Sequence, residues 1–175
     1  KPDRSAQEME LSSPQFLPDG RHFLYRVSSA DPDRSGTWVA SLDTSEKTRL
    51  LDSSITAVTY APEGYLLYAR DGVLMAQSFD ASTRRLAGEP RAVSGSIPAN
   101  SVLSASHGLL AFGGGTTAEN LVWFDEGGKT LGAQPATVTL NNVALSPTGD
   151  QLVGTSTDPT RSGVWMVDLD RDVPT

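Results

Sequence analysis

The sequence predicts an all-β fold, namely part of a β-propeller of about four blades, each a four-stranded antiparallel sheet, with the last blade incomplete. Three observations in the 175 residues support this prediction. A glycine turn recurs at Gly20, Gly64, Gly108 and Gly149, in steps of 44, 44 and 41 residues. A short apolar triplet follows each turn, and a second apolar stretch ends on an aspartate in every copy. Short strands repeated at this period are typical of propeller blades.

The turns are the first element of each repeat. Their sequences are FLPDG at Phe16–Gly20, YAPEG at Tyr60–Gly64, SASHG at Ser104–Gly108 and LSPTG at Leu145–Gly149. Proline presets the backbone for a tight turn, and glycine adopts positive φ without a steric cost. Strands are therefore predicted on both sides of each turn.

The remaining strands follow from the apolar stretches. Each stretch closes on an aspartate and is followed by a polar turn and another brief extended run, which makes four strands per period. A two-sheet sandwich is the alternative, but it gives no reason for the same turn and aspartate to recur at fixed intervals. The strand-end aspartates are Asp43, Asp80, Asp125 and Asp170. The predicted boundaries are a lead-in over residues 1–11 and a partial propeller over residues 12–175, with blades over 12–53, 54–96, 97–137 and 138–175.

Composition narrows the classes of partner. The chain has 21 acidic and 14 basic side chains and a formal net charge of -7, so it lacks the basic surface that nucleic acid requires. No apolar run approaches the roughly 20 residues that span a bilayer, so no membrane insertion is expected. The absence of cysteine excludes disulfides and thiolate zinc, and it leaves the cellular compartment open. The abrupt ends at Lys1 and Thr175 predict a piece of a longer protein.

The repeat resembles the TolB-like, WD-repeat-like propeller blades of bacteria. More narrowly, the segments Ser13–Val27, Tyr65–Asp80 and Leu121–Gly132 are similar to the propellers found C-terminal to bacterial serine/threonine protein kinases. This resemblance implies a whole ring of about six blades, of which a little under four lie in this chain. The chain has none of the kinase motifs, so any catalytic domain is expected outside it.

No catalytic set is evident, and neither an enzyme activity nor a cofactor is expected. His22 and His107 lie on turns of different blades, with no neighbouring carboxylate at ligand spacing. No serine lies in a nucleophile elbow, and the glycine run at Gly113–Thr117 lacks the lysine of a phosphate-binding loop.

The segment Asp31-x-Asp33-x-Ser35-Gly36 matches the first half of a calcium loop. The twelfth position should be a bidentate glutamate, but it is Leu42. A charged hairpin loop is therefore predicted in place of a metal site. A sialidase-type box is rejected as well, because Ser35 occupies its required glycine position and the segment precedes the third strand.

The loops between strands two and three, and those between blades, share one face of a propeller, which is usually the binding face. Arg34 and Arg161 are the candidate partner-binding anchors, because they take the same position in DPDRSGTW and DPTRSGVW and a guanidinium is able to make bidentate contacts. The other candidates are Asp31, Asp33 and Asp158; the alternative is that all five are ordinary solvent-facing turn residues. The expected loop face comprises Ser28–Thr37, Gly113–Asn120 and Thr157–Gly163, with the blade connections Ser94–Asn100 and Gln134–Asn142. Trp38, Trp123 and Trp165 are predicted to pack between blades.

Together these features predict a non-catalytic module for protein or ligand recognition, the sensor or scaffold part of a bacterial signalling protein resembling the kinase-linked family. One alternative is the accessory gating propeller of a prolyl-oligopeptidase-like hydrolase, and another is a TolB-like periplasmic transport component. A part-ring leaves two blade faces without a neighbour, so the fragment is expected to self-associate through them.

Overall fold

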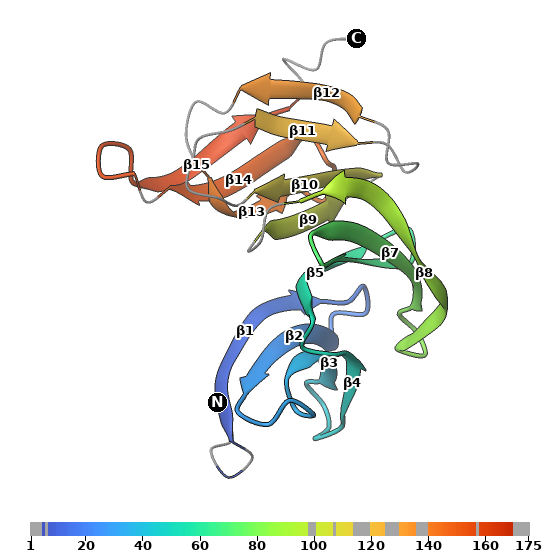
Figure 1. The fold of residues 1–175 in the computed structure, drawn as a ribbon. Coiled ribbons are helices and arrows are strands. Elements are labelled where there is room, and N and C mark those ends of the chain that lie inside the picture. The colour runs from blue at the N-terminus through green and yellow to red at the C-terminus, as the bar shows by residue number, and fades with distance from the viewer. Residues whose placement is uncertain are drawn as a thin grey trace.

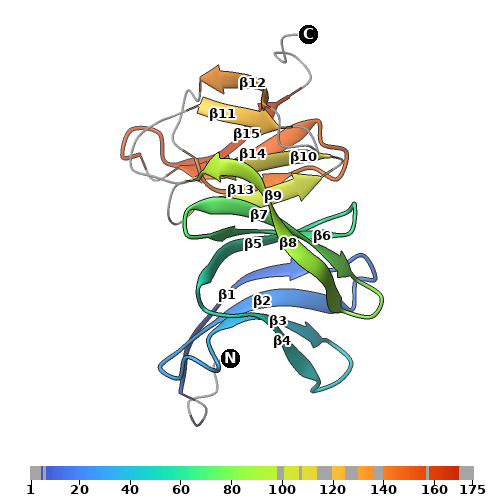
Figure 2. The ribbon, with the colours of Figure 1, turned by 45° about the vertical axis from the view of Figure 1, so that its right-hand side comes forward.

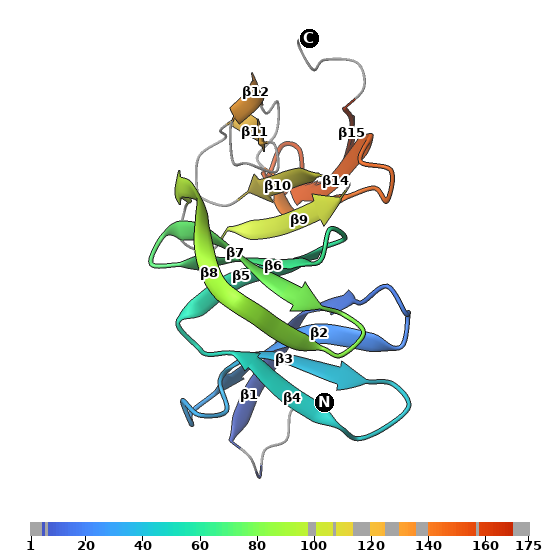
Figure 3. The same cartoon turned by 90° about the vertical axis from the view of Figure 1, so that its right-hand side faces the viewer.

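The computed structural model describes residues 5, 7–97, 101–106, 108–113, 120–124, 130–135, 140–156 and 158–169. These residues form fifteen β-strands and no α-helix. The prediction of an all-β partial propeller is confirmed. Figures 2 and 3 show blade one at the bottom and blade two above it, with the strands of blades three and four together at the upper end, where β11 and β12 lie highest.

Blades one and two are four-stranded sheets in the orders β1-β2-β3-β4 and β5-β6-β7-β8, and all their strand pairs are antiparallel. The first strand begins at Glu8, inside the stretch that was expected as a lead-in. Its Glu8–Ser29 pairing puts residues 8–11 in the sheet, so blade one starts four residues earlier than predicted. The strands are β1 (Glu8–Phe16), β2 (His22–Ser29), β3 (Gly36–Ser41), β4 (Lys47–Leu51), β5 (Ile55–Ala61), β6 (Tyr65–Arg70), β7 (Val73–Asp80) and β8 (Arg85–Ser96).

Blade three is seen as two antiparallel pairs, β10-β9 and β11-β12, with β10 in contact with β11. Blade four has the three-stranded order β13-β14-β15 within the described residues. The strands are β9 (Val102–Ser106), β10 (Leu109–Gly113), β11 (Asn120–Phe124), β12 (Thr130–Pro135), β13 (Asn141–Leu145), β14 (Gln151–Ser156) and β15 (Gly163–Asp168).

The predicted glycine turns join the first two strands of each blade. Gly20, Gly64, Gly108 and Gly149 all have positive φ, between 64° and 89°. In three of them the glycine N–H donates to a carbonyl oxygen three residues earlier, over 3.0 Å. The four glycine turns therefore form as the sequence predicts, and each one connects two antiparallel strands.

The hydrophobic core lies between the blades. One cluster joins Leu24 and Val39 of blade one to Leu66 and Tyr68 of blade two. A second joins blades two and three, and a third joins blades three and four. Figure 1 shows the corresponding succession of sheets along the molecule. Each sheet is thus covered by its neighbour, as a propeller requires.

The innermost strands carry the same irregularity in three blades. Ser13 in β1, Ala57 in β5 and Asn142 in β13 have positive φ of 53°, 51° and 50°. Each coincides with a register shift against the second strand of its blade. A bulge of this kind bends the strand and turns backbone groups out of the ladder. The inner strands therefore present polar groups to the inner side of the part-ring.

Gly36 and Gly163 begin the equivalent strands β3 and β15, with φ of 137° and 144°. A Cβ at Gly36 would overlap the carbonyl oxygen of Leu51 in β4, whereas one at Gly163 would meet nothing within 4 Å.

We expect Gly163→Ala to lower the free energy of unfolding by about 1–2 kcal/mol through backbone strain. Gly36→Ala should cost at least roughly 2 kcal/mol more, because the strand must also shift. Urea unfolding measures both, and equal losses would contradict the account.

Candidate functional site

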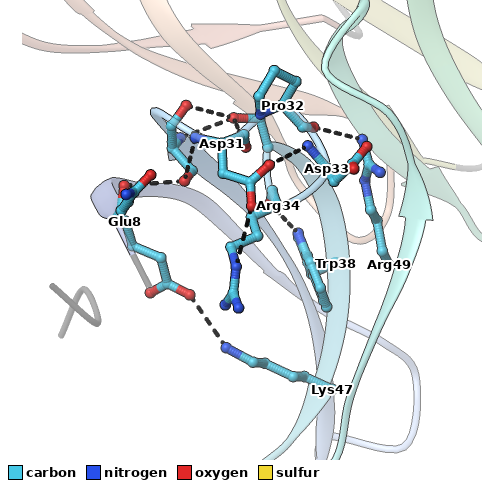
Figure 4. Close-up of polar contacts among 11 residues, drawn as sticks. Glu8, Asp31, Pro32, Asp33, Arg34, Trp38, Lys47 and Arg49 are labelled. Carbon is cyan, nitrogen blue, oxygen red and sulfur yellow. Dashed lines mark hydrogen bonds and ion pairs between the residues drawn. The ribbon is translucent and has the colours of Figure 1, made fainter. Parts of the chain in front are cut away.

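The loop between β2 and β3 is closed by its own polar groups. The Asp31 carboxylate accepts a hydrogen bond from the Asp33 N–H over 3.0 Å, and the Asp31 carbonyl accepts one from the Arg34 N–H over 3.1 Å. The buried Ser35 hydroxyl donates to the Ser29 carbonyl and accepts from the Ser29 N–H, both over 2.9 Å. Ser35 thus ties the two ends of the loop together. Figure 4 shows this arrangement around Asp31.

The loop between β14 and β15 repeats this construction. The Asp158 carboxylate accepts from the N–H and from the hydroxyl of Thr160, both over 2.7 Å. These bonds, that from the hydroxyl first, lower the pKa of Asp158 and keep the carboxylate ionised. The Asp158 carbonyl accepts from the Arg161 N–H over 3.0 Å. The threonine in place of Asp33 therefore preserves the loop closure.

A tryptophan holds each loop from the following strand. The Trp38 indole N–H donates to the Arg34 carbonyl over 3.0 Å, and the Trp165 indole N–H donates to the Arg161 carbonyl over 2.9 Å. Neither indole belongs to a cluster between described blades, which differs from the predicted packing. The spacing of four residues between arginine and tryptophan is what brings the indole under the loop. The side chain of Trp123 lies outside the described residues.

The five predicted site residues fall into two groups. Asp31, Asp33 and Arg34 share one loop of blade one, and the Arg34 Nε forms an ion pair with Asp31 over 3.5 Å. Asp158 and Arg161 share the equivalent loop of blade four. We call the edge of the part-ring that carries these loops and the blade connections the loop rim. Blade two contributes only a two-residue turn there, in which Asp71 and Gly72 both have positive φ.

Several of the predicted loop segments cannot be placed. Residues 98–100, 114–119 and 136–139, which take up the middle of the expected loop of blade three and parts of two blade connections, lie outside the described residues. His107 lies outside them too. Within the described part of the chain, no three or more histidine, aspartate or glutamate side chains are grouped so that they could hold a metal ion.

His22 has a carboxylate neighbour, contrary to the prediction. Its Nδ1 lies 2.5 Å from Asp19 Oδ2, at the turn between β1 and β2. The other Asp19 oxygen accepts the N–H groups of Arg21 and His22, both over 2.9 Å. These backbone bonds hold the pKa of Asp19 well below its usual range. The Asp19–His22 contact closes the turn between β1 and β2. The separation of three residues between the aspartate and the histidine was the sequence signal for this contact.

A cavity of about 470 Å³ lies against the inner strands of all four blades. Among the described residues that line it, hydroxyl and amide side chains predominate in the polar part, and Arg26 of β2 is the only charged one. No described carboxylate lies within ion-pair distance of Arg26. The cavity is lined mainly by residues 13–15 of β1, 56–59 of β5, 101–104 at β9 and 142–144 of β13.

Sequence reasoning missed this cavity. All four residues that stand three positions before a turn motif line the cavity, and this shared position was the sequence signal for it. These residues are Ser13, Ala57, Ser101 and Asn142. Three of these four residues form the positive-φ bulges described above. Bulges are not readable from residue type alone, because positive φ is uncommon for serine and alanine.

Across the described ranges, no helix combines the length and the apolar character that crossing a membrane would need.

No protein-family model matches the chain, and no curated protein sequence matches it. Solved structures do. TolB from Acinetobacter baumannii is 16% identical with a TM-score of 0.68, over 93% of this chain and 42% of that one. A gluconolactonase from Xanthomonas campestris is 17% identical with a TM-score of 0.63, over 89% and 56% of the two chains.

The calcium-binding protein regucalcin from Agrobacterium tumefaciens is 14% identical with a TM-score of 0.62, over 86% of this chain and 55% of that one. The chain thus spans about half the length of these solved structures. At such identities the likeness shows the fold alone. The chain has the fold of a TolB-like β-propeller and represents part of such a ring.

Proposed function

We propose that this chain is a non-catalytic recognition module that binds a protein or a small ligand at its loop rim. The observation that carries the proposal is that the same loop is built twice, on blades one and four, with matching hydrogen bonds. In each loop an aspartate carbonyl accepts the arginine N–H, and a tryptophan indole holds the arginine carbonyl.

Such loops suit binding for an energetic reason. Their backbone groups are already engaged, so less conformational entropy is lost when a partner arrives. Both arginine side chains project from a held backbone, and a guanidinium forms bidentate bonds with carboxylates. Asp31, in its ion pair with Arg34, orients that guanidinium on the rim. Arginine is also among the residues that most often dominate binding energy.

We further propose that the module is the sensor or scaffold part of a bacterial signalling protein. The support is the resemblance of Ser13–Val27, Tyr65–Asp80 and Leu121–Gly132 to kinase-linked propellers. A gating propeller of a prolyl-oligopeptidase-like hydrolase and a TolB-like periplasmic transport component are the alternatives. The full-length gene distinguishes them: a kinase upstream supports the first, a Gly-x-Ser-x-Gly domain downstream the second, and a leader peptide directly upstream the third.

The arginine anchors are tested by affinity capture from a bacterial extract, read by quantitative mass spectrometry. We expect the double variant Arg34→Ala, Arg161→Ala to retain its partners at least roughly tenfold less than wild type. Arg21→Ala is the matched control, because Arg21 forms an exposed ion pair with Asp43 at the other end of the strands. Retention of the same proteins by all three chains would contradict a role for the loop rim.

The inner cavity favours a second candidate function, the binding of a small hydroxylated carboxylate. Arg26 supplies one cation without a described carboxylate partner, and the serine, threonine, asparagine and glutamine side chains supply hydrogen bonds to hydroxyls. A volume of about 470 Å³ lies within the usual range for small-molecule sites. A gluconolactonase is among the similar folds, so gluconate is a reasonable probe.

We expect gluconate to bind the wild type in isothermal titration calorimetry, and Arg26→Gln to weaken binding at least roughly tenfold through loss of the charged hydrogen bond. Arg91→Gln is the control variant, since Arg91 of β8 lies over the ring of Tyr65 in β6 and is not among the described residues that line the cavity. Glucitol, which lacks the carboxylate, should bind neither protein measurably. Equal gluconate affinity of the Arg26→Gln and Arg91→Gln variants, or no gluconate binding by the wild type, would rule out this site.

The non-catalytic part of the proposal has its own test. We expect the purified chain to hydrolyse model lactones, esters, glycosides and phosphates no faster than buffer, because no nucleophile, base and oxyanion donors converge among the described residues. Turnover is followed by pH-stat titration or chromogenic release. An activity that follows the chain through purification would overturn it.

A further inference from the structure

Arg49 connects the outer strand of blade one to the loop between β2 and β3. It lies in β4, where it pairs with Trp38 of β3. Its Nη2 donates a hydrogen bond over 3.1 Å to the carbonyl oxygen of Pro32, 17 residues earlier in the chain. Figure 4 shows the Arg49 side chain beside Trp38, with its guanidinium at the Pro32 carbonyl. The bonds from Ser35 and Trp38 close the loop on itself and on β3, and the bond from Arg49 attaches it to β4.

The junction between this loop and β3 leaves room for the guanidinium. A Cβ at Gly36 would lie only 3.2 Å from the Arg49 Nε. With a φ of 137°, Gly36 also has a backbone conformation that other residues rarely adopt. In blade one, the glycine of the DPxRSGxW pattern therefore gives the Arg49 side chain its path to the loop.

Arg49 is a poor choice for stability alone. In the described part of the chain its Nε is a buried donor without an acceptor, and such a donor costs free energy that an apolar side chain would not. No described carboxylate lies within ion-pair distance of the guanidinium. Local violations of this kind are expected at functional sites, where another requirement outweighs them. What Arg49 supplies here is the bond to Pro32.

The bond to Pro32 fixes the loop backbone next to the candidate anchor Arg34. The Arg34 carbonyl accepts the Trp38 indole N–H. Pro32 has no N–H, so its carbonyl is the backbone group through which it can be fixed, and Arg49 binds that carbonyl. Asp33 and Arg34, both exposed, follow Pro32 directly. Their side chains therefore project from a backbone segment that is bound to β4 at its start and to β3 at its end.

We propose that Arg49 is a positioning residue of the loop rim, which fixes the loop conformation in which the Arg34 guanidinium meets a partner. The inference rests on the proposed function of the rim and adds a residue that lies outside the loop. Arg49 acts through Pro32 and does not touch the partner. Because a fixed loop loses less conformational entropy on binding, the affinity depends on Arg49 although the stability of the fold does not.

Arg49→Met tests the structural half of the proposal, because methionine is a flexible side chain of comparable length without donors. We expect the midpoint of urea unfolding to equal or exceed that of the wild type, since the buried unsatisfied donor is gone. In nuclear magnetic resonance, the Trp38 indole N–H should exchange with solvent at least roughly tenfold faster, because the loop that it binds opens more often. The Trp165 indole N–H, which makes the equivalent bond in blade four, should be unchanged.

Affinity capture from a bacterial extract measures binding, on the set of proteins that the wild type retains. We expect Arg49→Met and Arg34→Ala each to lower retention at least roughly fivefold. The two substitutions together should lower it no further than Arg34→Ala alone, because both act through the same guanidinium. Arg91→Met is the matched control, since Arg91 lies on the outer strand of blade two, over the ring of Tyr65, and it should bind like the wild type.

Full retention by Arg49→Met, with partners lost by Arg34→Ala, would overturn this inference and leave the proposed function of the rim intact. Full retention by Arg34→Ala as well would contradict that function itself. A fall in the urea midpoint in proportion to the lost retention would mean that Arg49 only stabilises the fold. That result, additive losses in the double variant, or unchanged exchange of the Trp38 indole would each overturn the positioning role.

Discussion

Packing between neighbouring blades is the interaction on which the rest of this structure depends. Each hydrophobic cluster of the described residues lies between two successive sheets, and none lies within a single blade. Leu24 and Leu66 are buried only because they belong to adjacent blades. A blade is therefore stable through its neighbours, in the way of repeat proteins whose units each bury a face on the next.

Polar contacts along the inner strands complement this apolar packing. The Gln15 amide accepts the Tyr60 N–H over 2.7 Å and donates to the Tyr60 carbonyl over 3.3 Å, which links blade one to blade two. The Ser104 hydroxyl accepts the Leu145 N–H over 2.8 Å and links blade three to blade four. A buried backbone group left without such a partner would cost stability. These links hold the inner strands in place, and the bulge residues Ser13, Ala57 and Asn142 line the cavity beside them.

The loops between strands two and three of blades one and four contribute no residue to the hydrophobic clusters between blades. The loop rim can differ from blade to blade, from the two-residue Asp71-Gly72 turn to the longer loops of blades one and four, without disturbing any cluster. In those two blades the carbonyl oxygens of Arg34 and Arg161 accept hydrogen bonds from the indoles of Trp38 and Trp165, four residues further along the chain. Binding residues on loops that a rigid scaffold positions are common in proteins. The same repeat thus supplies both a scaffold and a rim.

The sequence by itself determined the strand order, the four turns and the loop rim, because these depend on local chemistry repeated at a fixed period. Glycine and proline specify turns wherever they occur, and the shared DPxRSGxW pattern specified two equivalent loops. Only the tertiary structure decided that β1 begins at Glu8, that the indoles hold arginine carbonyls and that Arg26 lines a cavity. Those features depend on strand register and on bulges at Ser13, Ala57 and Asn142. Register is set by cross-strand and cross-blade packing, which no single stretch of sequence contains.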